Sequence, residues 1–105
     1  MNIKLIKIKK NLKNKNMKEF KDLKFKDKNY GSGKRAYLEF PNKYGVSVIT
    51  GGGSYSNKDN PYELAVFLDG ELCYDTHITN DVMGYLTSEE VTKIMKQIQE
   101  LDSLD

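Results

Sequence analysis

The sequence predicts an α+β domain in which an antiparallel sheet of four or five strands, a meander of hairpins, packs against one C-terminal helix. Apolar residues alternate with period two in several short runs between residues 20 and 75. An Asp-Gly pair separates two of these runs, and apolar residues recur at helical spacing after residue 87. With 105 residues, the chain has room for one modest core.

Three runs in the first half are predicted strands. Alternation is weak over residues 20–25 and clear over residues 35–40, and Val and Ile are concentrated in residues 44–50. Pro41 presets a bend and Asn42 tolerates left-handed backbone angles, so the second and third strands form a hairpin. Residues 51–61 are rich in Gly, Ser and Asn and are predicted to be a long loop.

The pair Asp69-Gly70 predicts a second hairpin between residues 62–68 and 71–75. A two-residue turn opposes Leu68 to Glu71, and the same register continues down to Leu64 opposite Asp75. Both faces of this hairpin are then apolar, one with Ala65, Phe67, Leu72 and Tyr74, the other with Leu64, Val66, Leu68 and Cys73. Such a strand is either covered on both faces or covered once, with the other face offered to a partner.

Thr87 and Glu90 have the spacing of a capping box, which predicts the start of a helix. One apolar stripe follows, made of Val91, Ile94, Met95, Ile98 and Leu101. We expect this helix to lie on one face of the sheet. Between the second hairpin and the helix, the sequence favours one helical turn at residues 80–83.

Charge is strongly segregated along the chain, although 17 basic residues nearly balance 15 acidic ones. Residues 1–16 hold six Lys and no acid and are interpreted as a basic N-terminal extension, with residues 17–105 as the single domain. A functional basic arm is the alternative interpretation of residues 1–16. Residues 17–58 hold nine basic and four acidic residues, and residues 59–105 hold eleven acidic residues and two Lys.

No motif in the sequence indicates catalysis or a cofactor. Cys73 and His77 are the only residues of their types, and four positions along one strand separate them by roughly 13 Å. They give no ligand spacing for zinc, and the run of Gly51 to Gly53 lacks the Lys-Ser/Thr pair of a phosphate loop. We therefore expect a non-enzymatic protein without metal or cofactor. One Cys and no long apolar window favour a cytoplasmic protein that does not cross a membrane.

Six segments between residues 20 and 101 together resemble a group of small proteins encoded by phages and prophages. They are YGVSVI at 44–49, GGSY at 52–55, PYELAV at 61–66, LCYDT at 72–76, DVMGYL at 81–86 and TSEEV at 87–91. The resemblance implies a single α+β domain without an enzymatic signature. Some small proteins of this type are anti-CRISPR or other anti-defence factors.

The leading hypothesis is a phage-type inhibitor that binds a host defence nuclease, or its nucleic-acid groove, in a stoichiometric complex. The acidic second half would face a basic surface of that host protein, with Leu64, Val66 and Leu68 as the apolar centre. The candidate partner-binding residues are Tyr55, Tyr62, Glu63, Asp69, Glu71, Asp75 and Asp81.

The alternative hypothesis is a nucleic-acid-binding accessory protein that uses the Lys-rich first half, where basic and aromatic residues interleave. Its candidate residues are Lys21, Lys24, Lys26, Lys34 and Arg35. The sequence leaves open whether the protein forms a homodimer.

Overall fold

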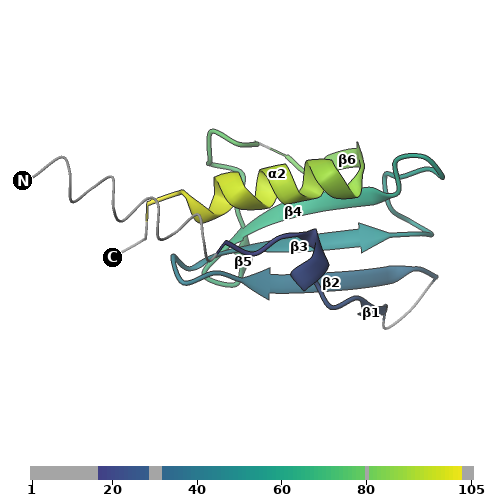
Figure 1. Cartoon of the computed structure of the whole chain (residues 1–105), viewed down its shortest axis with the longest axis horizontal. Helices are drawn as coiled ribbons and strands as arrows, with labels where there is room; N and C mark the ends of the chain where they lie inside the picture. The colour runs from purple at the N-terminus through teal and green to yellow at the C-terminus, as the bar shows by residue number, and fades with distance from the viewer. Residues whose placement is uncertain (1–16, 29–31, 80, 103–105) are drawn as a thin grey trace, which may run out of the picture.

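The structure is a computed structural model that describes residues 17–28, 32–79 and 81–102. In this part of the chain, six strands form one antiparallel sheet and a single α-helix packs against it, so the predicted fold class is confirmed (Figure 1). The predicted basic extension, residues 1–16, lies outside the described residues. The elements in chain order are η1 (Phe20–Asp22), β1 (Lys26–Asp27), β2 (Lys34–Glu39), β3 (Tyr44–Thr50), β4 (Tyr62–Leu68), β5 (Glu71–Leu72), β6 (Met83–Leu86) and α2 (Ser88–Gln99).

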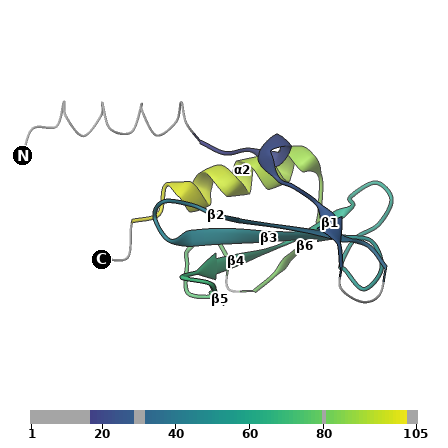
Figure 2. The ribbon, with the colours of Figure 1, turned by 90° about the horizontal axis from the view of Figure 1, so that it is seen from below.

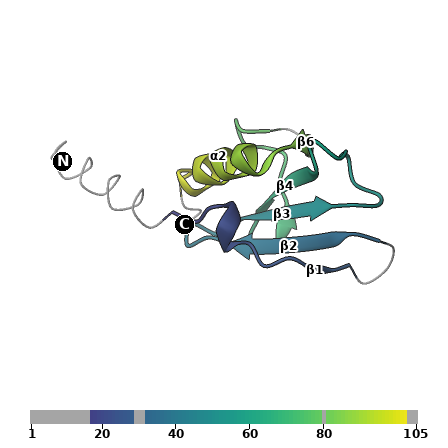
Figure 3. The same ribbon diagram turned by 45° about the vertical axis from the view of Figure 1, so that its right-hand side comes forward.

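The strands lie in the order β1-β2-β3-β4-β5, and β6 also pairs with β4. Figure 3 shows β1 to β4 side by side, with β6 next to β4. β5 pairs with the second half of β4 and β6 with the first half. The predicted meander is therefore confirmed from β1 to β5. Because spatial order follows chain order, the basic first half of the domain forms one edge of the sheet and the acidic half the other.

The turn between β2 and β3 forms as predicted, but with a different residue in the left-handed conformation. Lys43 has φ 73°, whereas Asn42 is buried. The Asn42 side-chain amide donates to the carbonyls of Ile98 and Leu101, 3.0 Å away in each case. The Asn42 side chain thus satisfies the free carbonyls at the C-terminal end of α2. Lys43, the next residue, adopts the left-handed conformation of the turn.

The Asp69-Gly70 hairpin is confirmed, with φ 52° and 84° at the two turn residues. Phe67 pairs with Leu72 and Leu68 with Glu71, as predicted. The predicted strand 71–75 is too long, because β5 ends at Leu72 and only one further ladder bond follows. The predicted pairing of residues 64 and 75 is wrong, since β6 occupies that side of β4.

Two local predictions are wrong at either end of the sheet. Residues 20–25 are not a strand: a capping box between Glu19 and Asp22 closes a 3-10 turn, and β1 begins only at Lys26. The helical turn predicted at residues 80–83 is absent from the described residues 81–83, and Met83 begins strand β6 instead. In both places a contact with a distant part of the chain outweighs the local pattern.

Helix α2 is confirmed with its predicted cap and apolar stripe. The Thr87 hydroxyl accepts from the amide of Glu90 at 3.2 Å, and the Glu90 carboxylate accepts from the amide of Thr87 at 2.9 Å. The residues of the stripe on α2 itself are buried: Val91, Ile94, Met95 and Ile98. Within the described part of the chain, no helix has both the length and the apolar character needed to cross a membrane.

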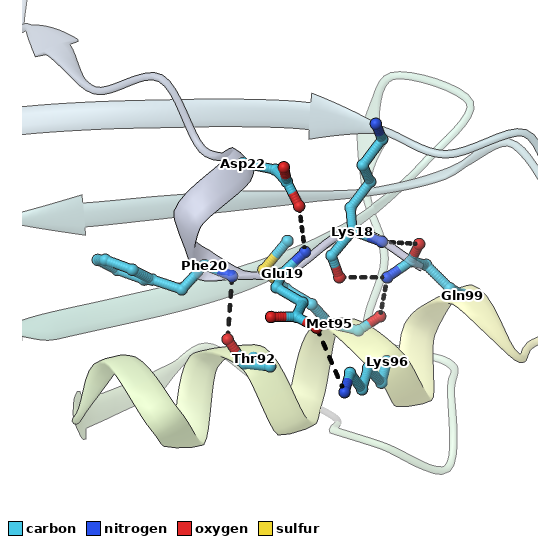
Figure 4. A network of polar contacts seen from close by, with 8 residues as sticks. All are labelled: Lys18, Glu19, Phe20, Asp22, Thr92, Met95, Lys96 and Gln99. Carbon is cyan, nitrogen blue, oxygen red and sulfur yellow. Dashed lines mark hydrogen bonds and ion pairs between the residues drawn. The ribbon is translucent and has the colours of Figure 1, made fainter. Parts of the chain in front are cut away.

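A short N-terminal segment is hydrogen-bonded to one flank of α2 (Figure 4). The main chain of Lys18 exchanges two hydrogen bonds with the side-chain amide of Gln99, at 2.8 and 2.9 Å. The amide of Phe20 donates to the Thr92 hydroxyl at 2.9 Å. Segment 18–22, which includes η1, therefore lies with α2 on the same side of the sheet, and no helix of the described residues lies on the other side (Figure 2).

Candidate functional site

The two faces of the central strands differ because residues alternate between them. The register aligns Ala36, Val48 and Leu64 in one row, and all three are buried beneath α2. The neighbouring row, Arg35, Ile49 and Glu63, points to the opposite side. We call that side the open face. It is formed by Arg35, Tyr37, Ser47, Ile49, Glu63, Ala65, Phe67 and Leu72.

The open face is hollowed into a concavity of about 790 Å³. Its floor is formed by the small side chains of Ser47 and Ala65, which pair across β3 and β4. These two residues are only 7% and 9% exposed. Next to them, a Cβ atom at Gly45 would lie 3.0 Å from the Tyr37 hydroxyl. Small floor residues between larger ones produce a hollow that can receive a projecting group of a partner.

The aromatic side chains of Tyr37 and Phe67 line one part of the hollow. Tyr37 and Phe67 meet edge to face, with ring centroids 5.3 Å apart and planes at 81°. Tyr37 remains 42% exposed. Burial, with the neighbouring carboxylate of Glu39, raises the pKa of the Tyr37 phenol. The phenol is therefore a hydrogen-bond donor at neutral pH and offers an accessible aromatic surface.

Four basic side chains line the same concavity from the β1–β2 edge, namely Lys24, Lys26, Lys28 and Arg35. The Nε of Arg35 donates to the hydroxyl of Ser47 at 3.1 Å, which holds the guanidinium over the floor. Its two terminal nitrogens are geometrically suited to an oxyanion. Lys28 is fixed by a 2.8 Å bond from its Nζ to the carbonyl of Gly52.

Both carboxylates that line the hollow are already engaged by donors. Asp27 accepts from Lys34 at 2.8 Å, and this contact lowers the pKa of Asp27. Glu63 accepts from the backbone amide of Tyr55 at 2.7 Å. The basic groups therefore dominate the β1–β2 side of the concavity, while Glu63 places one negative charge on the β4 side.

The residues predicted for nucleic-acid binding are partly brought together. Lys24, Lys26 and Arg35 line the hollow. Lys34 instead forms an ion pair with Asp27, and Lys21 belongs to η1, which packs on α2. Ser47, Ile49 and Phe67 also line the hollow, and the sequence patterns did not predict their part in it. The signal was available for Ser47, since the alternation of Gly45, Val46, Ser47 and Val48 separates small from bulky residues.

The residues predicted for protein binding are dispersed. Tyr55 is 61% exposed and bonds to Glu63, whereas Tyr62 is half-buried against Phe20, with centroids 4.9 Å apart. Glu63 and Asp69 lie at opposite ends of β4, roughly 20 Å apart at 3.3 Å per residue. Glu71 is exposed beside the Asp69 turn, and Asp75 and Asp81 are exposed in the connection to β6.

The apolar strip assigned to the interface is wrong for two of its three members. Leu64 and Val66 are 0% and 1% exposed in the core, and Leu68 packs against that core from its edge. On the open face, the apolar side chains of β4 and β5 that are partly or largely exposed are Phe67 and Leu72. Leu64 and Val66 thus belong to the core, and accessible apolar surface lies on the open face.

The remaining chemical candidates lie apart from this surface. Cys73 is a buried free thiol, and His77 is exposed in the connection to β6. Among the residues that the structure describes, no group of three or more His, Cys, Asp or Glu side chains is arranged to hold a metal ion. The open face is therefore the candidate site.

Comparison with family models, with curated proteins and with solved structures finds no match to this chain.

Proposed function

We propose that the protein binds single-stranded nucleic acid on the open face of its sheet. The observation that supports this proposal is the arrangement of Lys24, Lys26, Lys28 and Arg35 around the same hollow as Tyr37. A basic groove that tracks phosphates, combined with an aromatic surface for bases, is the usual chemistry of single-strand binding. Unpaired bases are needed, because paired bases cannot turn their faces toward a side chain.

Each part of the hollow has a role in this proposal. Arg35, oriented by Ser47, contacts a phosphate with its terminal nitrogens, and Lys24 and Lys26 contact neighbouring phosphates. Tyr37 stacks on a base, backed by Phe67. The small floor at Ser47 and Ala65 leaves room for that base. The phosphate contacts stay near the β1–β2 edge, because acidic residues dominate the opposite edge.

Salt dependence of binding tests the proposal quantitatively. The three phosphate contacts of Arg35, Lys24 and Lys26 predict a slope of log K against log salt of about −2 from the hollow, at about −0.7 per contact. We expect the double variant Lys26→Ala/Arg35→Ala to make the slope of the full chain shallower by about 1.4. Fluorescence anisotropy of a labelled oligo(dT) measures it, and the six Lys of residues 1–16 contribute equally to all variants.

The matched control removes a positive charge from the opposite side of the molecule. Lys93 is exposed on α2 and does not line the hollow. Lys93→Ala should leave affinity and slope within error of the unmodified protein. An equal change in slope per charge removed for Lys93→Ala and for the hollow variant would contradict a site on the open face.

Removing the negative charge of Glu63 should strengthen binding, whereas removing the basic charges of the hollow should weaken it. Its carboxylate is the negative charge on the β4 side of the hollow, so a bound phosphate chain is repelled there. Glu63→Gln keeps an oxygen that can accept from the Tyr55 amide and should raise the affinity for oligo(dT) about twofold to fivefold. Unchanged or weaker binding would place the nucleic acid away from β4.

A second candidate function is the stoichiometric inhibition of a host defence nuclease, which the resemblance to phage proteins suggests. The observation that favours it is the apolar character of Ile49, Ala65, Phe67 and Leu72 in the hollow, with charges of both signs at the rim. Titration of the protein into purified defence nucleases should then abolish cleavage at a fixed molar ratio. Ala65→Arg, which fills the hollow, should remove the inhibition.

Charge reversal at Asp69, Glu71 and Asp75 separates the two versions of this second candidate. Inhibition that survives this triple change but not Ala65→Arg places the partner on the open face. Inhibition that is lost in the triple variant alone places it on the acidic edge of β5. A nuclease that is equally inhibited by both variants is bound elsewhere on the molecule.

A further inference from the structure

Tyr85 has a strained backbone that its own packing does not explain. Its φ is 56°, in the left-handed region, which is a strained conformation for a bulky residue. The side chain is nevertheless 54% exposed. Little burial compensates for the strain, so the conformation displays an aromatic ring at the surface.

The strain arises from an irregularity in the β4–β6 pairing. Tyr62 pairs with Leu86 and Leu64 with Met83, so Gly84 and Tyr85 together oppose the single residue Glu63. A bulge of this kind re-aims the side chains that it contains. Tyr85 is thereby placed beside Glu63, whose row belongs to the open face.

The loop before β4 brings a second exposed tyrosine to the same place. The amide of Tyr85 donates to the carbonyl of Tyr55 at 2.9 Å, and the amide of Tyr55 donates to Glu63 at 2.7 Å. A Cβ atom at position 84 would lie 2.6 Å from the Cβ of Tyr55, so glycine is required for this approach. Tyr55 is itself 61% exposed.

The pair lies in line with the basic end of the open face. Lys26, Arg35, Ile49 and Glu63 follow one another across β1, β2, β3 and β4 in a single register row. At about 4.8 Å per strand, the row spans roughly 14 Å from Lys26 to Glu63, and Tyr55 and Tyr85 continue it. A strand held by Arg35 and Tyr37 that crosses the hollow therefore arrives at these two rings.

We propose that Tyr55 and Tyr85 form a second stacking platform that extends the path of a bound single strand beyond Glu63. This inference rests on the proposed binding of nucleic acid to the open face. Base stacking on an aromatic side chain tolerates any sequence and adds affinity for each base. The platform therefore lengthens the footprint of the protein without adding phosphate contacts, so the salt slope stays the same while affinity rises with strand length.

The test compares oligo(dT) strands of about 4, 8 and 12 nucleotides by fluorescence anisotropy, with the full chain and its variants. Tyr85→Gly removes the ring and also relieves the positive φ, so we expect an equal or higher melting temperature. We expect it to weaken the longest strand by about 5- to 150-fold and to leave the shortest unchanged. Tyr55→Ala should act in the same direction.

Two controls separate lost stacking from disturbed structure. Tyr85→Phe keeps the ring and should bind every strand like the unmodified protein. Tyr74→Ala removes another exposed tyrosine, 41% exposed beyond β5, and should have no effect at any length. A gain of affinity with strand length that survives both Tyr55→Ala and Tyr85→Gly overturns the platform.

The outcomes also distinguish this inference from the proposed function. In one outcome, binding of the shortest strand requires Arg35, but the gain of affinity with strand length is the same in the Tyr55 and Tyr85 variants. The platform is then wrong and the proposed binding function stands. A loss of equal size at every length also overturns the platform, because it indicates a disturbed hollow. If no strand binds in an Arg35-dependent way, the proposed function fails and the platform fails with it.

Discussion

The two faces of the sheet arise from the same strands and have opposite compositions. On the covered face, Val46, Val48 and Leu64 are fully buried under α2. On the open face, the neighbouring positions are Gly45, Ser47 and Ala65, with charged and aromatic side chains around them. Side-chain volume thus decides which face receives the helix, because bulky residues gain most from burial. The face of small residues is left hollow, and we propose that it binds the ligand.

The largest predicted effect lies on the covered face. Leu64→Ala removes a side chain with 0% exposure from the centre of the core, so we expect a loss of about 2–5 kcal/mol in the free energy of unfolding. Urea denaturation measures it. Ile49→Ala, one strand away on the open face, should cost less than about 1.5 kcal/mol, because Ile49 is only half-buried. Equal losses would remove the distinction between the faces.

The second largest loss of stability is expected for Asn42, whose side chain is hydrogen-bonded to the end of α2. Asn42→Ala leaves the carbonyls of Ile98 and Leu101 without their side-chain donor in a buried setting. We expect a loss of about 1–3 kcal/mol in urea denaturation. Asn57→Ala is the control. The side-chain oxygen of Asn57 accepts hydrogen bonds only in an exposed turn, so this variant should lose less than about 1 kcal/mol in the free energy of unfolding.

Local signals in the sequence predicted much of this fold. The Asp69-Gly70 turn and the Thr87–Glu90 cap were correct because each depends on residues within a few positions. Strand β6 was missed because Met83 and Leu86 become a strand only beside Leu64 and Tyr62, which are distant in the sequence. The 3-10 turn at residues 20–22 likewise depends on the long-range contact with α2.

The candidate site was predicted less completely than the fold. Charge and alternation pointed to Lys24, Lys26 and Arg35, and the hollow does bring these residues together. The choice of β4 face was wrong, because Val66 and Phe67 are both apolar and hydropathy alone does not rank them. The exposed position of Tyr85 could not be predicted, since it results from a bulge that no sequence pattern indicates.

A smaller stability effect is expected at the helix cap. Thr87→Ala removes the hydroxyl that accepts from the amide of Glu90, so the free energy of unfolding should fall by about 1 kcal/mol. Differential scanning calorimetry measures this change as a lowered melting temperature. Ser88→Ala lies one residue further, outside the capping box, and should change stability by less than about 0.5 kcal/mol. A cap variant as stable as the unmodified protein would contradict the assigned helix start.

The smallest stability effect should accompany a large binding effect. Arg35 is exposed, so Arg35→Ala should change the free energy of unfolding by no more than about 0.5 kcal/mol. Its affinity for oligo(dT) should nevertheless fall about tenfold, because a charge-assisted contact to phosphate is lost. Urea denaturation and anisotropy on the same sample separate the two effects. A variant that loses stability and affinity together would assign Arg35 to the fold instead.

The most direct test of the central claim is an NMR titration of the 15N-labelled protein with oligo(dT). We expect the amide shifts to concentrate on the open face, at Arg35, Tyr37, Ser47, Ile49 and Ala65. Residues on the outer surface of α2, such as Lys93 and Gln97, should keep their positions. Shifts centred on α2, or no shifts at a concentration at which anisotropy reports binding, would contradict the assignment of the open face as the binding surface.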